Sequence, residues 1–284
     1  MQTLISAESL DALIASGRPV VLLDCRFDLA APDAGARAYE EGHLPGAHYV
    51  DLERDLSGPK HDAEGRFRGR HPLPDGTAFA ETVGRWGIGP STAAVVYDAH
   101  GGMFAARAWW MLRWLGHREV ALLDGGLKAW IAKGGKLEAG TPHSPGESRP
   151  YPMQPDAMPT VEAAAVLQGL GRMKVIDARA PERYRGEVEP LDKAAGHIPG
   201  ALNRFFQLNL QPDGRFKPAE ALRAEFDALI AGRLPGEVVH QCGSGATACH
   251  NLLAMEHAGL AGSLLYPGSW SEWSSDPTRP VAQG

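Results

Sequence analysis

One stretch decides the fold: Val238-Val239-His240-Gln241-Cys242-Gly243-Ser244-Gly245-Ala246-Thr247-Ala248-Cys249-His250. It begins as a short apolar strand that ends at Gln241, continues as a glycine-rich loop, and enters a helix from about Thr247 to Ala258. Such a turn points backbone N–H groups inward, and the helix N-terminus adds partial positive charge at the same place. We therefore predict that Cys242 is a nucleophile, held as a thiolate by amide donors.

Cys242 could instead be a structural residue or a metal ligand. A free cysteine is most often a buried core residue, but a core position does not need two glycines and a serine directly after it. A metal site would be formed by His240, Cys242, Cys249 and His250. Their spacing differs from that of zinc sites, so we predict neither a metal nor an organic cofactor.

Length and composition describe an ordinary globular protein. The 284 residues are 44% hydrophobic and 22% charged, which suits one large domain or two of usual size. The formal net charge of -6 argues against nucleic acid and anionic membranes as partners. Cys25, Cys242 and Cys249 are too few for a disulfide framework, which favours a reducing compartment. Since neither a secretory signal nor a membrane-length apolar run is seen, we predict a cytoplasmic protein.

The second half of the chain repeats the first. Residues 175–179 match 22–26, Gly-His-Ile-Pro-Gly-Ala at 196–201 matches Gly-His-Leu-Pro-Gly-Ala at 42–47, and residues 238–273 match 95–130 without a gap. Such self-similarity predicts two domains, 1–139 and 160–284, joined by a linker rich in proline and glycine at 140–159. Apolar strands alternate with helical patterns, which predicts a parallel sheet flanked by helices in each domain.

The two copies differ at the loop. Cys242 aligns with Ala99 and Ser244 with Gly101, so the first copy is predicted to be inactive and the second to carry the chemistry. His43 and His197 occupy the same motif in both copies, and Asp24 and Asp177 end the same strand in both. Because these histidines and aspartates also occur in the copy that lacks the cysteine, we predict that their role is structural. For Trp270 and Trp273, walling the cleft and packing in the core remain alternatives.

These motifs, in this order in both halves, resemble the two-domain sulfurtransferases of the rhodanese superfamily. The resemblance implies two α/β domains with five-stranded parallel sheets, the second catalytic. It also implies that Cys242 takes a sulfane sulfur from a small-molecule donor, becomes a persulfide, and passes the sulfur to a thiol or cyanide. A thioredoxin-like reductant is among the acceptors it allows.

The loop is most similar to that of the 3-mercaptopyruvate sulfurtransferases, which read Cys-Gly-Ser-Gly-Val-Thr. Thiosulfate-preferring members typically carry Arg-Lys after the cysteine, whereas no basic residue stands between Cys242 and His250. By this resemblance Ser244 acts with a histidine, matched here by His71, and with an acid that is either Asp51 or Glu53. The loop residues expected around the substrate are Gly243, Gly245, Ala246 and Thr247.

The resemblance also assigns the donor carboxylate to arginines, of which Arg183 matches the first. A guanidinium can bind a carboxylate through two parallel hydrogen bonds. The second arginine is missing, since the matching region is Glu189-Pro190-Leu191-Asp192, and Arg185 and Lys193 are candidates to replace it. This departure keeps thiosulfate:cyanide sulfurtransfer open as an alternative function.

Two more distant functions fit the sequence less well. A cysteine-dependent phosphatase would need an arginine at the end of the loop, where this chain has Ala248. A noncatalytic sulfur carrier would not need the whole loop that this chain keeps.

Overall fold

The computed structural model describes residues 1–140, 149–154 and 158–284, so much of the linker expected at 140–159 lies outside the described residues. The chain forms two compact units. The first comprises Met1–Ser57, Pro74–Ala157 and Gln211–Phe216, and the second comprises Gly58–Leu73, Met158–Leu210 and Lys217–Gly284. Each unit therefore contains a short segment from the other half of the sequence, and one of these segments carries His71.

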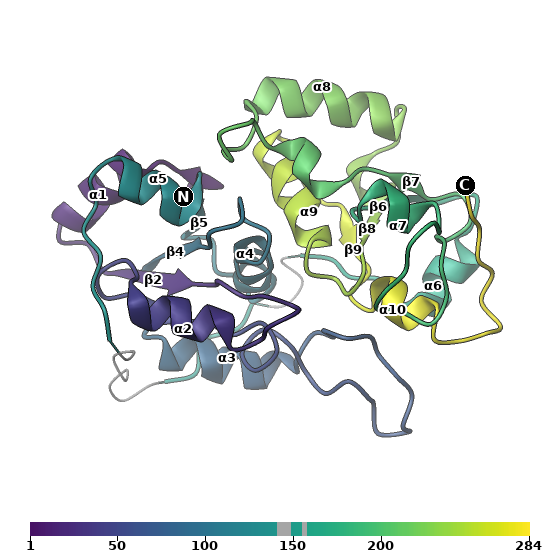
Figure 1. The fold of residues 1–284 in the computed structure, drawn as a ribbon, viewed down its shortest axis with the longest axis horizontal. Coiled ribbons are helices and arrows are strands. Elements are labelled where there is room, and N and C mark those ends of the chain that lie inside the picture. The colour runs from purple at the N-terminus through teal and green to yellow at the C-terminus, as the bar shows by residue number, and fades with distance from the viewer. Residues whose placement is uncertain (141–148, 155–157) are drawn as a thin grey trace. The chain divides into compact units, whose positions relative to one another are not determined.

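The first unit is built on a five-stranded parallel sheet in the order β1-β5-β4-β2-β3 (Figure 1). The strands are β1 Leu4–Ile5, β2 Val20–Asp24, β3 His48–Tyr49, β4 Ala93–Tyr97 and β5 Val120–Leu123. In the central strands, Leu22 pairs with Val95 and Val95 with Ala121. These strands are continuous apolar runs because helices cover both faces of the sheet.

Five helices pack on this sheet: α1 Ala7–Ala15, α2 Ala34–Glu41, α3 Gly76–Arg85, α4 Ala105–Trp114 and α5 Gly126–Ala132. Residues of α1, α2 and α5 form one core cluster with Leu22 and Val95, while α4 packs against β4 and β5 on the other face. Ser6 caps the start of α1, since its Oγ accepts the Ser9 N–H at 3.2 Å.

The second unit has a parallel sheet of four strands, in the order β7-β6-β8-β9. They are β6 Lys174–Asp177, β7 Leu202–Asn203, β8 Val238–Gln241 and β9 Leu264–Leu265. The fifth strand expected here is reduced to a single parallel bridge between Thr160 and Leu265, in the place that β1 takes beside β5 in the first unit. Pro159 accepts the Leu265 N–H through its carbonyl but has no N–H of its own to lengthen the ladder.

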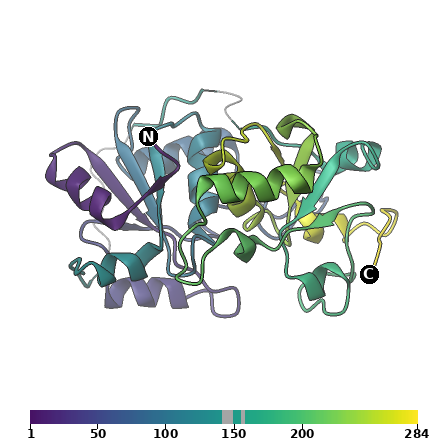
Figure 2. The ribbon, with the colours of Figure 1, turned by 90° about the horizontal axis from the view of Figure 1, so that it is seen from above.

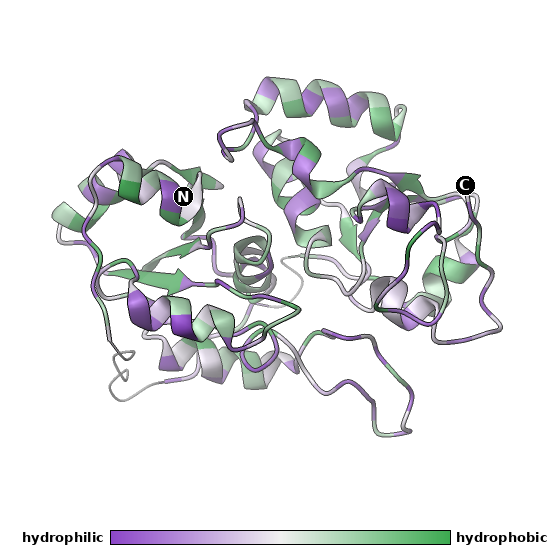
Figure 3. Cartoon of the chain, in the orientation of Figure 1, coloured by the Kyte–Doolittle hydropathy of each residue, from purple (hydrophilic) through white to green (hydrophobic). Residues whose placement is uncertain are grey.

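Helices again cover both faces of this sheet (Figures 1 and 2). They are α6 Ala163–Gln168, α7 Pro181–Tyr184, α8 Ala219–Ile230, α9 Ala248–His257 and α10 Ser269–Trp273, with short 3-10 turns at Phe206–Asn209 and Pro235–Glu237. Figure 3 shows hydrophobic and hydrophilic residues alternating along α8, whose buried residues are Leu222, Phe226 and Ile230. No helix in the described ranges is long and apolar enough to cross a membrane.

Trp270 and Trp273 belong to the core of the second unit. Both are fully buried in a cluster with Val175 and Val239. Each indole N–H donates to a backbone carbonyl, that of Ala194 or Pro280. Of the two alternatives for these tryptophans, core packing is the one that the structure shows.

The paired histidines and aspartates make the same contacts in both units. His43 stacks on Tyr39 with ring centroids 3.7 Å apart, and His197 stacks on Tyr184 at 3.9 Å. Each Nδ1 lies within hydrogen-bond distance of the carbonyl of the same tyrosine. Asp24 and Asp177 each form a buried ion pair with the arginine two residues further on, at 2.6 and 2.7 Å. These contacts fit the structural roles expected of all four residues.

Candidate active site

The loop between β8 and α9 curls around the sulfur of Cys242. The Gly245 N–H donates to Sγ at 3.2 Å, and Gly245 has a φ of +83°, which only glycine adopts without strain. Ala246 and Thr247 complete the turn into α9, where their carbonyls accept the N–H groups of the residues three positions on, both at 3.1 Å. Cys242 is only 2% exposed, so its sulfur lies in a largely dry environment with an amide donor directed at it.

The start of α10 fixes the strand side of the loop. Ser269 Oγ accepts the Cys242 N–H at 3.1 Å, and Trp270 N–H donates to the Cys242 carbonyl at 3.0 Å. Ser271 N–H donates to the Gly243 carbonyl at 2.9 Å. On the helix side, the Cys249 thiol donates to the Gly245 carbonyl at 3.3 Å. The loop is thus bonded from two sides, which preorganises it before any substrate binds.

Ser244 and His71 lie together in the second unit, although they are far apart in sequence. Ser244 Oγ and His71 Nδ1 are 2.7 Å apart, and both side chains are buried. His71 lies in the segment Gly58–Leu73, which Figure 1 shows as an extended loop beside α10. The candidate acids Asp51 and Glu53 belong to the first unit, where Asp51 Oδ1 accepts the Glu53 N–H at 2.8 Å. Which acid acts with His71 stays a prediction.

Two guanidinium groups converge on Gly243, directly after the cysteine. A Cβ atom added at Gly243 would lie 2.8 Å from Arg70 Nη2 and 3.4 Å from Arg183 Nη1. Of these two arginines, only Arg183 is a donor-binding residue predicted from the sequence. Arg70 is a candidate that sequence reasoning did not identify, and the signal that could have found it is its place directly before His71.

The two residues considered as replacements for the missing arginine lie elsewhere. Arg185 is exposed and forms a surface ion pair with Glu187 at 2.7 Å, and Lys193 is also exposed. An exposed pair of this kind contributes little to binding or stability. Neither side chain is among the nearest neighbours of Gly243.

Acidic side chains hold both arginines in place. Asp192 accepts hydrogen bonds from Arg70 Nη1 and from Arg183 Nη2, the latter at 3.2 Å. Arg183 Nη2 also bonds Glu189 at 2.7 Å. Burial raises the pKa of Asp192, and the two neighbouring guanidinium groups oppose that rise. The site therefore contains one buried carboxylate shared by two arginines.

The corresponding loop of the first unit is closed on an internal anion. The Asp98 carboxylate accepts four backbone N–H groups at 2.8 to 3.0 Å, those of His100, Gly102, Phe104 and Ala105. Asp98 aligns with Gln241, the residue directly before Cys242 in the other copy. In the first unit this loop therefore holds a negative charge among its backbone N–H groups.

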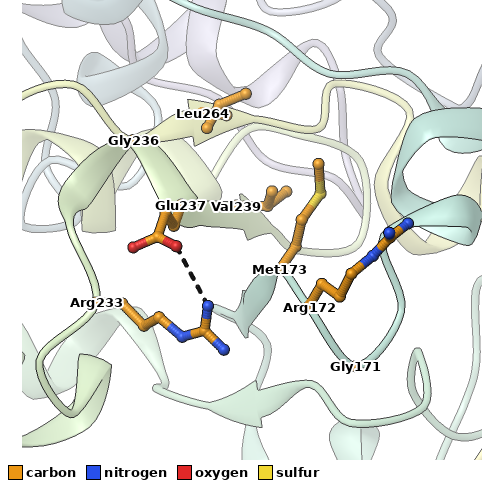
Figure 4. Close-up of a pocket in the computed structure, with 8 residues that line it drawn as sticks. All are labelled: Gly171, Arg172, Met173, Arg233, Gly236, Glu237, Val239 and Leu264. Atoms are coloured by element: carbon orange, nitrogen blue, oxygen red, sulfur yellow. Dashed lines mark hydrogen bonds and ion pairs between the residues drawn. The ribbon is translucent and has the colours of Figure 1, made fainter.

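A pocket in the second unit lies away from this loop. It is lined by Gly171, Arg172, Met173, Arg233, Gly236, Glu237, Val239 and Leu264 (Figure 4). These residues precede or begin β6, β8 and β9, whereas the Cys242 loop follows the carboxyl end of β8. Figure 4 shows Arg233 paired with Glu237, so the pocket offers no nucleophile and is not the candidate site. In the described part of the chain, no group of three or more His, Cys, Asp or Glu side chains could hold a metal ion.

Comparison with known proteins agrees with the geometry. The rhodanese-like domain model matches residues 6–133 and 160–276. A probable 3-mercaptopyruvate sulfurtransferase of Pseudomonas aeruginosa is 50% identical over 99% of this chain and 98% of its own. A thiosulfate sulfurtransferase of Gallus gallus is 34% identical over 96% of this chain and 93% of its own.

A solved structure has a similar fold. The 3-mercaptopyruvate sulfurtransferase from Leishmania major superposes with a TM-score of 0.82 at 29% identity, covering 96% of this chain and 74% of that one. The repeated domains, the loop around a buried cysteine and these matches lead to one conclusion. The chain belongs to the rhodanese family, as a tandem-domain sulfurtransferase of the 3-mercaptopyruvate and thiosulfate sulfurtransferase group.

Proposed function

We propose that the sulfur donor is 3-mercaptopyruvate and that Cys242 carries the sulfur as a persulfide to a thiol or cyanide. The observation that supports this donor most directly is the buried pair of Ser244, in the loop that holds the sulfur, and His71, whose Nδ1 lies 2.7 Å from Ser244 Oγ. A donor with a free thiol has a proton that must be moved during the reaction. A hydroxyl and an imidazole in contact are suited to move it.

The proposed first half-reaction forms one S–S bond, breaks one C–S bond and moves one proton from sulfur to carbon. The Cys242 thiolate attacks the donor sulfur, an S–S bond forms, and the C–S bond breaks with its electron pair passing to the pyruvate enolate. Ser244 and His71 take the proton of the donor thiol and return it to the enolate carbon, which gives pyruvate. This is nucleophilic catalysis with a covalent intermediate.

In the second half-reaction an acceptor thiolate or cyanide attacks the outer sulfur of the persulfide. The S–S bond breaks, its electron pair returns to Cys242, and the thiolate is restored. The Gly245 N–H, directed at Sγ, stabilises the anionic sulfur in both states. No redox cofactor takes part in this sequence, because the sulfur moves between nucleophiles without net electron transfer to the protein.

Thiosulfate is the second candidate donor. One observation favours it: two guanidinium groups near Gly243 place positive charge close to the cysteine, and thiosulfate is a dianion. Thiosulfate has no thiol proton, however, so the Ser244–His71 pair would have no proton to move in its reaction.

The deciding experiment is steady-state sulfur transfer to cyanide with both donors. We expect a higher kcat/KM for 3-mercaptopyruvate and a Cys242 mass increased by one sulfur atom after donor treatment. Cys242→Ser should abolish both signals, while Cys25→Ser, the matched change at a buried cysteine of the first unit, should keep them. A higher kcat/KM for thiosulfate would replace this donor assignment, and turnover by Cys242→Ser would contradict the mechanism.

A further inference from the structure

Ser271, in the first turn of α10, is hydrogen-bonded to both chain segments that form the Ser244–His71 pair. Its backbone N–H donates to the Gly243 carbonyl at 2.9 Å, and its Oγ accepts the Arg70 N–H at 3.0 Å. Gly243 directly precedes Ser244, and Arg70 directly precedes His71. One residue therefore connects the two segments, at a distance of one position in the sequence from each member of the pair.

The hydroxyl of Ser271 is held in one orientation. It donates to the Gly268 carbonyl at 3.0 Å while it accepts the Arg70 N–H, and the residue is only 3% exposed. Since the hydroxyl hydrogen is used by Gly268, the lone pairs of the oxygen are left to accept from the backbone of the other segment. The Ser271 hydroxyl is thus a fixed point of attachment and not a mobile surface group.

The backbone of the attached segment lies very close to the start of α10. Gly69 has a φ of +104°, and a Cβ there would lie 2.8 Å from the Gly268 carbonyl oxygen and 3.1 Å from Ser271 Oγ. Only glycine both adopts this conformation without strain and fits at this distance. The segment is therefore packed against α10 at the same place where Ser271 binds it.

This attachment matters because the segment Gly58–Leu73 is a long excursion from the rest of the unit (Figure 1). Its two ends are joined, since the Gly58 N–H donates to the Pro72 carbonyl at 2.9 Å. The bond from Ser271 holds the backbone directly before His71. The position of the imidazole relative to the Cys242 loop therefore depends on this bond.

The first copy of the repeat has no serine at this place. The residue aligned with Ser271 is Lys128, which is exposed. That copy also has neither the cysteine nor the serine of the loop, which align with Ala99 and Gly101. The buried hydroxyl thus occurs in the copy that carries the candidate active site.

We propose that Ser271 is a positioning residue, which holds His71 at hydrogen-bond distance from Ser244 and so suits the site to donors that have a thiol proton. This inference rests on the proposed function, because the proton to be moved belongs to 3-mercaptopyruvate. Proton transfer requires its partners within about 3 Å, and a displacement of about 1 Å can lower a rate by about 100-fold. Ser271 acts through His71 and not on the reacting atoms.

The experiment compares Ser271→Ala, His71→Asn, the double variant that combines them, and Ser274→Ala. Ser274 is the matched control: it directly follows α10, is buried, and its Oγ makes no hydrogen bond with the part of the chain that the structure describes. We measure kcat with 3-mercaptopyruvate and with thiosulfate. Hydrogen exchange of the Arg70 amide, followed by mass spectrometry of peptides that contain it, reports the attachment without any sulfur transfer.

Ser271→Ala should lower kcat for 3-mercaptopyruvate by about tenfold and kcat for thiosulfate by less than about twofold, because only the first reaction uses the Ser244–His71 pair. In the His71→Asn background the same substitution should not lower kcat further, since no imidazole is left to position. The Arg70 amide should exchange about tenfold faster in Ser271→Ala, as expected for the loss of its hydrogen bond. Ser274→Ala should match the wild type in every measurement.

Two patterns of kcat would overturn the proposal. An equal loss with the two donors, or an equal loss with and without His71, would mean that Ser271 stabilises the loop as a whole. An unchanged kcat for 3-mercaptopyruvate in Ser271→Ala would mean that His71 keeps its position without this bond.

The proposed function can fail separately. If the wild type turned over thiosulfate but not 3-mercaptopyruvate, the donor assignment would be wrong. Faster exchange of the Arg70 amide in Ser271→Ala would then still support the attachment of this segment by Ser271, whereas unchanged exchange would overturn the attachment as well.

Discussion

Ser244 Oγ and His71 Nδ1 lie 2.7 Å apart and are both shielded from solvent. Under the proposed function this pair moves a proton that belongs to the donor thiol. Ser244→Ala should therefore lower kcat for 3-mercaptopyruvate by about 100-fold, the usual contribution of general acid–base catalysis. With thiosulfate, which has no such proton, kcat should change by less than about threefold.

Steady-state assays of Ser244→Ala with the two donors in parallel test this prediction. The thiosulfate rate serves as the internal control for correct folding of the loop. An equal loss with both donors would show that Ser244 holds the loop in shape and does not act on the thiol.

His240, two residues before Cys242, is expected to make the stability of the protein depend on pH. It is fully buried, and desolvation, with a smaller effect from Arg204, lowers its pKa from 6.5 to about 3. Between those values the unfolded chain binds a proton that the folded chain does not. The stability contributed by neutral His240 is thus complete above about pH 6.5 and decreases as the pH falls toward 3.

Between pH 7 and pH 5 this linkage should cost the wild type about 2 kcal/mol of unfolding free energy. His240→Leu removes the titrating group. Between pH 7 and pH 5 the unfolding free energy of this variant should therefore fall by about 2 kcal/mol less than that of the wild type. Urea unfolding of both proteins at the two pH values measures the difference. Parallel pH dependences would show that His240 is not the residue responsible.

The glycine loop between β8 and α9 makes different demands at its two glycines. Gly245 needs its φ of +83°, whereas Gly243 is needed for space beside Arg70. Gly245→Ala should therefore lower the unfolding free energy by about 1 to 2 kcal/mol, the cost of a left-handed conformation for a residue with a Cβ. Gly243→Ala should lower it by less, because a flexible arginine can shift.

Denaturant unfolding of the two variants, read against the wild type, checks this ordering. Each variant is the control for the other, since both add the same methyl group to the same loop. A larger loss for Gly243→Ala would mean that packing around the guanidinium groups, and not backbone conformation, dominates the stability of the loop.

The elements with strong local signals were the ones that could be predicted. The strand that ends at Gln241 and the helix that follows Thr247 were predicted from the sequence, because buried strands and helix starts have local signals. The fifth strand predicted for the second sheet is reduced to one bridge, beside Pro159. The effect of Pro159 depends on its pairing with Leu265, which is distant in sequence. Arg70 was missed for the same reason: its partner Asp192 is distant in sequence, and charge alone does not indicate which residues meet.

Across the whole molecule, the two compact units do not coincide with the two halves of the sequence. The segment Gly58–Leu73 belongs to the unit of the second half and carries both Arg70 and His71. A fragment of residues 158–284 would contain Cys242 and Ser244 but neither partner. We expect such a fragment to lose at least about 100-fold in kcat/KM for 3-mercaptopyruvate, even where it folds.

A second chain would carry residues 58–73 joined by a flexible glycine-serine linker to 158–284, with circular dichroism confirming that both fragments fold. Recovery of part of the activity in this chain, and not in the shorter one, would support the assignment of the segment. Equal activity of the two fragments would contradict it.

The Asp98 carboxylate occupies the loop of the first unit and accepts its backbone N–H groups. Those N–H groups are therefore not available to hold a sulfur atom in that unit. Under the proposed function a saturated chain therefore stores a single sulfane atom, in the second unit. Each chain can then carry only one persulfide, and it must pass that sulfur to an acceptor before it can react with another donor. When the acceptor concentration is low, the persulfide form accumulates and donor consumption stops. The acceptor concentration, and not the donor concentration, then sets the rate of turnover.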